Sequence, residues 1–482
     1  MDLNPEPEQK TFGQRLQERI AQSRFFTFSL LLHVVIVVLG GSVVLFHKYS
    51  EPPDFTSDGS GLLGEEASVQ PPLEQPPDMS QQETFTPQEP TISAPTVTAI
   101  TTTTTNATAF QMASIPVPVK SIAGDVSKLA NTSVSKIAGK GVGKGMEGRM
   151  GGTARAGRMK DMGGKDKSEK AVMLGLRWLK DHQNPDGSWS DEYKPAMTGL
   201  AILCFLGHGE LPESPEFGPT VKKALDWVLE RGNEFQGRMS LTKDGWGGGN
   251  AGVYQHGILT YAMGEYYSMT KDERFVELLK QAVGYIVEGQ NPKGGWDYSY
   301  NKGPRQDLSV AGWQIQALKA AHLTGLGIPG VDEALDKAMP FLKSFQGNEG
   351  GFGYTGPENR LSLTGVGVLC TYFWKQDKDK VVREGIDFLL GKTELKYKSE
   401  KCDLYAWYYS TQACLMFGGS AWTKWNRMFQ DEIVESQSPD GSWPPTQGGH
   451  MQPNPGGAGP YYRTTLCILM LEVFYRYMPI NK

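Results

Sequence analysis

One seven-residue phrase recurs in the C-terminal part of this 482-residue chain. It reads QNPDGSW at 183–189 and returns as QNPKGGW at 290–296, QGNEGGF at 346–352 and QSPDGSW at 437–443. Self-similarity at intervals of tens of residues is typical of repeat architectures, in which each repeat is one supersecondary unit. The phrase therefore predicts a series of similar units.

Between the phrases, apolar residues recur at helical spacing. Each unit has an amphipathic helix that ends near the phrase and a second helix that is apolar on nearly all sides. The amphipathic helices are expected at 170–183, 219–233, 272–289, 331–345, 379–391 and 420–437. Because a helix apolar all round must be buried all round, the six hairpins are expected to close into a double ring. The predicted fold is an all-α, α/α toroid of six helical hairpins over residues 168–482.

The phrase itself has the composition of a structural turn. Pro and Asp-Gly stop the first helix of each hairpin, and Gly accepts positive φ. The Trp ring is expected to pack on the turn and tie one hairpin to the next, while the Gln amide caps free helix-end groups. A fifth, partial copy reads DGWGGG at 244–249.

An apolar run near the N-terminus has the length of a membrane span. Residues 25–46 hold no formal charge apart from His33, and about 20 apolar residues cross a bilayer as a helix. Basic residues precede this run and acidic ones follow it, which keeps residues 1–24 in the cytoplasm. We expect a single-pass membrane protein whose toroid is extracytoplasmic, and periplasmic in a Gram-negative cell.

Residues 47–167 are rich first in Pro and Thr and then in Gly. Such a segment buries too little apolar surface to offset its ordering entropy, so it is predicted to be a disordered linker. As a flexible coil it would reach about 60 Å. Basic residues in its Gly-rich half, Arg149 and Arg155 among them, are expected to be solvated or to contact an anionic surface.

Charge and cysteine content exclude several classes of protein. The net charge of −5 gives no reason to expect nucleic-acid binding. Five cysteines far apart in the chain make neither a disulfide framework nor a CxxC metal site. We expect buried free thiols at Cys204, Cys370, Cys402, Cys414 and Cys467.

A Gln followed by Gly-x-Trp in a helical toroid resembles the QW motif of squalene-hopene and oxidosqualene cyclases, in the prenyltransferase and squalene oxidase repeat superfamily. The resemblance covers residues 168–482. In that family an Asp-x-Asp-Asp stretch protonates an alkene. Here PRQDLSVAGW at 304–313 places Asp307 at the last Asp and Trp313 at the family's offset, but Gln306 stands at the protonating position. The resemblance implies a terpenoid cyclase-like isomerase or lyase only if Asp307 is the acid, so enzymatic activity stays open.

This sequence lacks the residues that two other classes of toroid protein need for their chemistry. Protein prenyltransferases bind Zn²⁺ through Asp-x-Cys and a His, whereas this chain has Cys402 and Asp403 in the opposite order and Tyr462 where a His would be needed. Complement-type thioester domains need Cys-x-x-Gln, which does not occur here. No metal and no cofactor are expected.

Polar and aromatic residues gather at the predicted N-terminal ends of the inner helices. In a closed toroid these ends converge on a central cavity, the usual ligand site. The cavity is expected to bind an isoprenoid, a lipid or a peptide. The alternative is structural, with Asp307 and Asp403 as helix N-caps and His256 as a core histidine. The candidate residues are Tyr254, His256, Asp307, Trp313, Asp403, Tyr405, Trp407, Tyr408, Tyr461, Tyr462 and Arg463.

Ser29 and His33 lie four residues apart within the apolar run, on one face of the expected helix. Polar side chains inside a membrane span mark functional positions. The pair resembles the Ser-x-x-x-His pattern in the anchor of TonB-family energy transducers, which implies a proton-channel partner of the ExbB/ExbD kind. A plain anchor, in which both side chains pack on another helix, is the alternative.

Overall fold

The computed structural model describes residues 13, 146–149, 151–240, 251–375 and 379–477. The predicted membrane span at 25–46, with Ser29 and His33, lies outside these residues. Within the described ranges, no helix is both long and apolar enough to span a bilayer.

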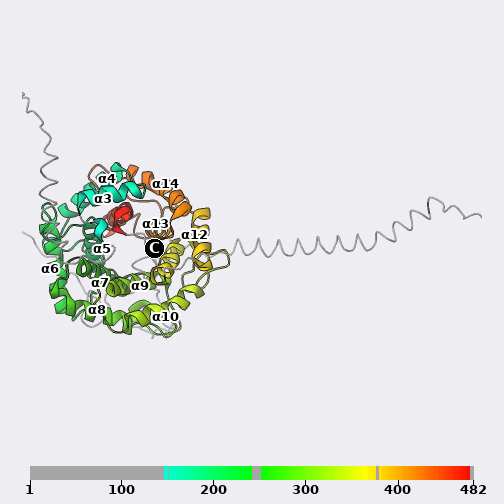
Figure 1. Ribbon diagram of the computed structural model, residues 1–482, viewed down its shortest axis with the longest axis horizontal. Coiled ribbons are helices and arrows are strands. Elements are labelled where there is room, and N and C mark those ends of the chain that lie inside the picture. The colour runs from blue at the N-terminus through cyan, green and yellow to red at the C-terminus, as the bar shows by residue number, and fades with distance from the viewer. Residues whose placement is uncertain (1–12, 14–145, 150, 241–250, 376–378, 478–482) are drawn as a thin grey trace, which may run out of the picture.

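Six helical hairpins make up the described part of the chain (Figure 1). The outer helices are α4 (Asp166–Asp181), α6 (Gly218–Glu234), α8 (Val276–Glu288), α10 (Val331–Ser344), α12 (Lys380–Lys392) and α14 (Gly419–Glu435). The inner helices are α5 (Lys194–Gly207), α7 (Ala251–Thr270), α9 (Leu308–Leu323), α11 (Leu361–Lys375), α13 (Leu404–Phe417) and α15 (Gly459–Leu471). Shorter helices are η2 (Glu147–Arg149), α3 (Gly152–Asp161), η3 (Glu273–Phe275), η4 (Tyr298–Tyr300) and α16 (Val473–Arg476). Apart from isolated bridges, the described residues form no strand.

The inner helices form a closed ring. Each contacts the next, from α5 through α7, α9, α11 and α13 to α15, and α15 contacts α5 again. The outer helices surround them (Figure 1). Every residue of α7 except Thr270 is buried, as expected for a helix that is apolar on all sides. The predicted α/α toroid is therefore confirmed.

The glutamine of each phrase joins two neighbouring hairpins. Gln290 Nε2 donates to Gly294 O within its own turn (2.9 Å) and to Ala334 O in the first turn of α10 (2.8 Å). An amide that bonds two carbonyls at once fixes the turn against the next hairpin. The same pair of hydrogen bonds is made by Gln183, Gln346 and Gln437. The bond from Gln437 ends on Ala171 O in α4 (2.9 Å), so it joins the sixth hairpin to the first.

The remaining positions of the phrase fit the backbone they occupy. Trp296 is buried and its indole N–H donates to Ile286 O (2.8 Å), which caps the preceding helix. Gly294 has φ of +99°, and a Cβ there would lie 2.1 Å from Lys337 O in α10. The phrase is a structural turn, as predicted, but the roles of its two side chains differ from the prediction: the hydrogen bonds of Gln290 join the next hairpin, and the indole of Trp296 caps the preceding helix.

The predicted end of the disordered linker at residue 167 is corrected. Residues 152–161 form α3, and Arg149 just before it is 2% exposed. Arg149 donates to Glu265 Oε2 (2.7 Å) and to Arg476 O (3.0 Å), and Arg155 donates to His208 O (2.7 Å). Composition does not reveal this order, because the partners that stabilise it lie in distant parts of the sequence.

The C-terminal turn lies within the ring. Helix α16, red in Figure 1, contacts α13 and α3. Arg476 Nη2 donates to the hydroxyl of Tyr261 in α7 (3.1 Å), which also bonds the hydroxyl of Tyr477 (3.1 Å). Since α7 and α13 are not neighbours in the ring, a turn that contacts both lies on its inner side. All five cysteines are buried and free, as predicted.

We expect Gly294→Ala to destabilise the protein by roughly 1–3 kcal/mol, because the new methyl group meets Lys337 O and the backbone has positive φ. Gly391→Ala is the matched control, since a Cβ there meets nothing within 4 Å, and it should leave stability unchanged or slightly raised. Urea denaturation of both variants measures the effect. Equal stability of the two would contradict the role given to the phrase.

Candidate functional site

Asp307 caps the N-terminus of α9. Its buried carboxylate accepts bonds from Ser309 N (2.9 Å) and Val310 N (3.1 Å). Arg305 Nη2 donates to the other carboxylate oxygen (3.0 Å). Every one of these bonds brings a donor to the carboxylate, which is the pattern of an ionised acceptor.

A second carboxylate, Asp297, lies against the same guanidinium. It pairs with Arg305 Nη1 and accepts from Tyr298 N (2.8 Å). Burial raises the pKa of Asp297 above its usual value, and the charge of Asp307 acts in the same direction. Arg305 therefore links two carboxylates held in different environments.

Tyrosine rings enclose the guanidinium. Arg305 Cζ lies 4.5 Å from the centroid of the Tyr298 ring and 5.5 Å from that of Tyr354. The hydroxyls of these two tyrosines bond each other. Tyr254 of α7 adds a third ring, 6.0 Å from that of Tyr298, and its hydroxyl bonds Ser309 Oγ (2.6 Å). We call Tyr254, Asp297, Tyr298, Asp307 and Tyr354 the aromatic cage.

Helices α9 and α13 meet on the inner side of the ring. Trp313 stacks on Tyr408, with ring centroids 5.9 Å apart and an interplanar angle of 17°. Gln316 Nε2 donates to the hydroxyl of Tyr409 (2.8 Å). Because α11 separates α9 from α13 in the ring, these contacts pass across its inner face.

This inner face holds polar atoms that no protein group pairs with. They are Trp313 Nε1, Gln316 Oε1, the hydroxyls of Tyr405 and Tyr408, and Gln412 Oε1. The amide of Gln412 lies near enough to the Tyr408 hydroxyl to act on its pKa, although the two make no hydrogen bond of normal geometry. All five side chains are at most 3% exposed. We call these residues the interior wall. Buried polar groups in native proteins nearly always have a partner, so five unpaired ones on two facing helices indicate a place where a ligand or water binds.

The cage and the interior wall are continuous. Burial raises the pKa of Tyr405, and the nearby charge of Asp307 raises it further. The Tyr405 ring lies 5.0 Å from that of Tyr409, which lies 5.5 Å from that of Trp313. The structure thus brings together Asp307, Tyr254, Trp313, Tyr405 and Tyr408 of the predicted set.

His256 belongs neither to the aromatic cage nor to the interior wall. Its Nδ1 accepts from Met239 N (3.0 Å) and its Nε2 donates to Ala282 O in the outer helix α8 (2.9 Å). Burial lowers the pKa of His256 to about 4. The ring is a neutral core histidine between the inner and outer layers, which is the structural alternative given above.

Of the three candidates on α15, Tyr462 lies beside the interior wall, since, in addition to burial, it helps to raise the pKa of Tyr405 and Tyr408 helps to raise its own. The other two lie apart from the wall. Arg463 donates to Trp443 O (3.0 Å) and Gln452 O (2.9 Å), so it holds the loop before α15. Tyr461 is only partly buried and packs on Trp178 of the outer helix α4, with centroids 5.3 Å apart. Tyr462 is buried in the core.

On α13, Asp403 is an N-cap that accepts from Tyr405 N (3.0 Å) and Ala406 N (3.2 Å). Trp407 is buried in the core. Cys402 is buried as well, and the part of the chain that the structure describes contains no group of three His, Cys, Asp or Glu residues placed to hold a metal ion.

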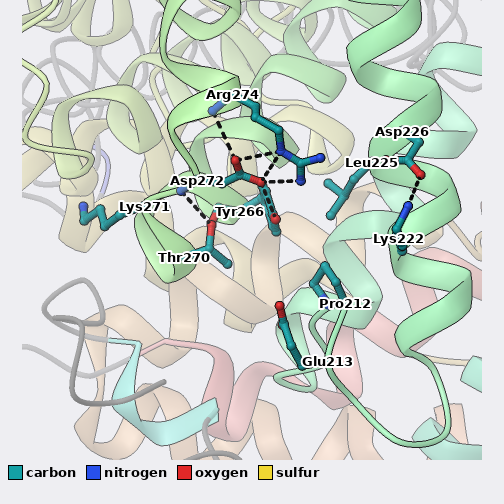
Figure 2. Close-up of a pocket in the computed structure, with 10 residues that line it drawn as sticks. All are labelled: Pro212, Glu213, Lys222, Leu225, Asp226, Tyr266, Thr270, Lys271, Asp272 and Arg274. Atoms are coloured by element: carbon teal, nitrogen blue, oxygen red, sulfur yellow. Dashed lines mark hydrogen bonds and ion pairs between the residues drawn. The ribbon is translucent and has the colours of Figure 1, made fainter. Parts of the chain in front are cut away.

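A polar pocket of about 510 Å³ opens on the outside, beside the C-terminal end of α7 (Figure 2). Four of its charged groups form two pairs, and Lys271 Nζ donates to Thr324 O outside the pocket (2.9 Å). Asp272 binds Arg274 Nη2 (2.6 Å) and the hydroxyl of Tyr266 (3.0 Å), and Lys222 binds Asp226 (2.6 Å). Because these groups satisfy each other, the interior wall and the cage are the stronger candidate site.

Comparisons with known proteins find solved structures of similar fold. No protein-family profile and no curated protein matches this chain. Among solved structures, a type II terpene cyclase, MstE from Scytonema, bound to geranylgeranyl dihydroxybenzoate, is 12% identical with a TM-score of 0.47 over 64% of this chain and 97% of its own. An α-1,6-mannanase, GH76A of a Salegentibacter species, bound to α-1,6-mannotetrose, is 11% identical with a TM-score of 0.48 over 65% of this chain and 100% of its own. At such values the likeness says nothing about chemistry.

Acid should destabilise the protein through His256. Its folded pKa of about 4 lies below the ordinary value of 6.5, so the unfolded chain takes up the proton first and the stability present above pH 6.5 is lost as the pH falls toward 4. At pH 4.5 this group should cost roughly 2.5 kcal/mol. Urea denaturation at pH 7 and 4.5 should show a smaller loss for His256→Gln than for the wild type.

His322→Gln serves as the control for this measurement. His322 is partly exposed and pairs with Asp332 on the surface. An acid-induced loss as large in His256→Gln as in the wild type and His322→Gln would contradict the assignment.

Proposed function

We propose that this protein is a membrane-anchored toroid that binds an amphiphilic isoprenoid or lipid along its interior wall. The observation that carries the proposal is the row of unpaired polar atoms on α9 and α13. Leaving a buried hydrogen-bonding group unpaired costs about 1–3 kcal/mol. A ligand with both apolar surface and hydrogen-bonding groups removes that cost and packs on the aromatic rings at the same time.

The hydrogen-bonding groups of the interior wall restrict the chemical class of the ligand. A pure hydrocarbon could pack on Trp313 and Tyr408 but would leave their polar atoms unpaired. Gln316 and Gln412 each present a carbonyl oxygen, an acceptor only. The ligand therefore carries at least one donor along its length, such as a hydroxyl or an amide N–H.

The membrane anchor is the second part of the proposal. It is supported by the apolar run at 25–46, the basic residues before it and the long polar linker after it. Such a tether would keep the toroid close to a bilayer, which is the source of the proposed ligand. The toroid would then lie outside the cytoplasm.

A terpenoid cyclase-like enzyme that uses Asp307 as its acid fits the geometry less well. A general acid needs a proton to give, but Asp307 accepts bonds from two backbone N–H groups and from Arg305. Of the two carboxylates, Asp297 is the better proton donor, because burial raises its pKa. Binding without turnover is the function that the site supports best.

Ligand binding is tested with the full-length protein in detergent, incubated with an extract of the host's membrane lipids and analysed by mass spectrometry. Trp313→Phe and Tyr408→Phe keep an aromatic ring and remove one unpaired polar atom each. Each variant should retain roughly three- to tenfold less ligand. The stability without ligand should be unchanged or raised in Tyr408→Phe, which removes only the hydroxyl, and lowered in Trp313→Phe, which also leaves a cavity in the core.

Tyr397→Phe is the matched control. The hydroxyl of Tyr397 donates to Pro444 O (2.7 Å), which is not part of the interior wall. This variant should lose stability and keep its ligand. If no compound co-purifies, or if all three variants retain it equally, the proposal is wrong.

A component of a TonB/ExbB-type proton-driven envelope complex is the alternative function for the N-terminal part, based on Ser29 and His33. If the pair mediates contact with a proton channel, a Ser29→Ala/His33→Ala double variant should lose an ExbB/ExbD-like partner in pull-down from solubilised membranes. An unchanged partner set would contradict this alternative and leave a plain anchor.

A further inference from the structure

The aromatic cage already holds a cation, and that cation belongs to the protein. Arg305 lies between the two carboxylates of Asp297 and Asp307 and over the faces of Tyr298 and Tyr354. Carboxylates and the negative faces of aromatic rings are the groups that bind guanidinium and ammonium ions. The cage therefore has the chemistry of a cation-binding site.

The cage and its own cation differ in exposure. The side chain of Asp307 is 0% exposed and that of Asp297 is 7% exposed, whereas that of Arg305 is 37% exposed. The anionic groups are thus fixed in the core, and the cation reaches them from the surface. Such an arrangement allows Arg305 to leave while the carboxylates stay.

The charges of the cage do not balance. Two buried carboxylates face one guanidinium. A further cation, Arg360, lies 6.0 Å from the centroid of the Tyr354 ring but pairs with Glu358. Both carboxylates pair with this one guanidinium of Arg305, and burial raises the pKa of Asp297. Because a buried charge that loses its partner is costly, a cation that displaces Arg305 must take over both of its ion pairs.

One more buried group belongs to this cluster. The hydroxyl of Tyr405, 3% exposed, pairs with no protein group. Burial raises the pKa of both Tyr405 and Tyr254, and the charge of Asp307 raises both further; Tyr405 also contributes to the raised pKa of Tyr254. An unpaired hydroxyl near Asp307 can accept a bond from an N–H donor that the cage binds.

The loop that carries Arg305 is anchored on both sides of it. Gln306 Oε1 accepts from Gly295 N (2.7 Å), and Asn291 Nδ2 donates to Gly303 O. The backbone on either side of Arg305 is therefore held by bonds that do not involve its guanidinium. Release of this side chain from the cage does not require the loop to unfold.

We propose that the aromatic cage is a recognition site for an organic cation, a guanidinium or an ammonium group, and that Arg305 is its internal competitor. A ligand bearing such a group displaces Arg305 and places its cation between Asp297 and Asp307. This inference rests on the proposed function only in that the rest of the ligand then lies along the interior wall. The ligand is accordingly a cationic amphiphile.

The probe is ethylguanidinium chloride, with N-ethylurea as an uncharged control of similar shape. Binding to the full-length protein is measured by ligand-observed NMR at constant ionic strength. Arg305→Met removes the competing charge and keeps an apolar side chain against the tyrosine rings. If Arg305 occupies the cage most of the time, this variant should bind ethylguanidinium at least about tenfold more tightly than the wild type.

A comparison between variants tests whether ethylguanidinium binds in the aromatic cage. Asp297→Asn in the Arg305→Met background should lose the gain in affinity, and N-ethylurea should bind none of the proteins measurably. Equal affinity of the wild type and Arg305→Met for ethylguanidinium, or equal binding of N-ethylurea, would overturn the proposal. If Arg305→Met does not fold, as judged by circular dichroism, Arg305→Lys replaces it and should also bind more tightly than the wild type, because its point charge lacks the bidentate fork.

The same measurements separate this inference from the proposed function. Trp313→Phe removes an unpaired atom of the interior wall but no member of the cage, so it should leave ethylguanidinium binding unchanged. Binding of ethylguanidinium without any retained lipid would support the cage and count against the proposed ligand. If lipid is retained but Arg305→Met does not change the affinity for ethylguanidinium, the interior wall is supported as the lipid-binding surface and the proposal for the cage is wrong.

Discussion

The structure depends on the closure of one ring. Helices such as α7 and α9 are apolar on all sides, and they can be buried only if each has a neighbour on both flanks and a layer of helices behind it. The contact of α15 with α5 and the bond from Gln437 to Ala171 O supply the last neighbour. Without this closure two inner helices would each expose an apolar face.

Closure also determines where the polar groups lie. It places α9 and α13 where Trp313 and Tyr408 stack across the inner face, and it brings Tyr254 of α7 beside Tyr298 of η4. On the same inner side, Arg149, Glu265 and Arg476 form a buried ion network that holds the N-terminal segment and the C-terminal turn together. Removing one partner of such a network typically costs about 3–5 kcal/mol.

The sequence predicted the repeats and the ring because both follow from local patterns. Helical periodicity locates the hairpins, and the Gln-to-Trp spacing of the phrase is the same in each copy that retains it. Asp307 and Asp403 could be recognised as N-caps from their position before an apolar run. These features need no knowledge of distant contacts.

The site was only partly predictable. Asp297, Tyr298 and Arg305 lie in the irregular segment between the second phrase and α9, where no periodicity indicates which side chains meet; the density of aromatic and charged residues in WDYSYNKGPRQD was the available signal. His256 was placed in the site because it is near a helix start, but its face of α7 turns toward α8. Arg149 was assigned to the linker because its ordering comes from Glu265, which is 116 residues away.

The central claim is that the interior wall is a ligand-binding surface, and an experimental density map of the natively purified full-length protein tests it most directly. The account predicts continuous non-protein density along α9 and α13, within hydrogen-bonding distance of Trp313 Nε1 and the hydroxyl of Tyr408. Separate water molecules that pair with these atoms one by one, with no continuous density between them, would contradict it.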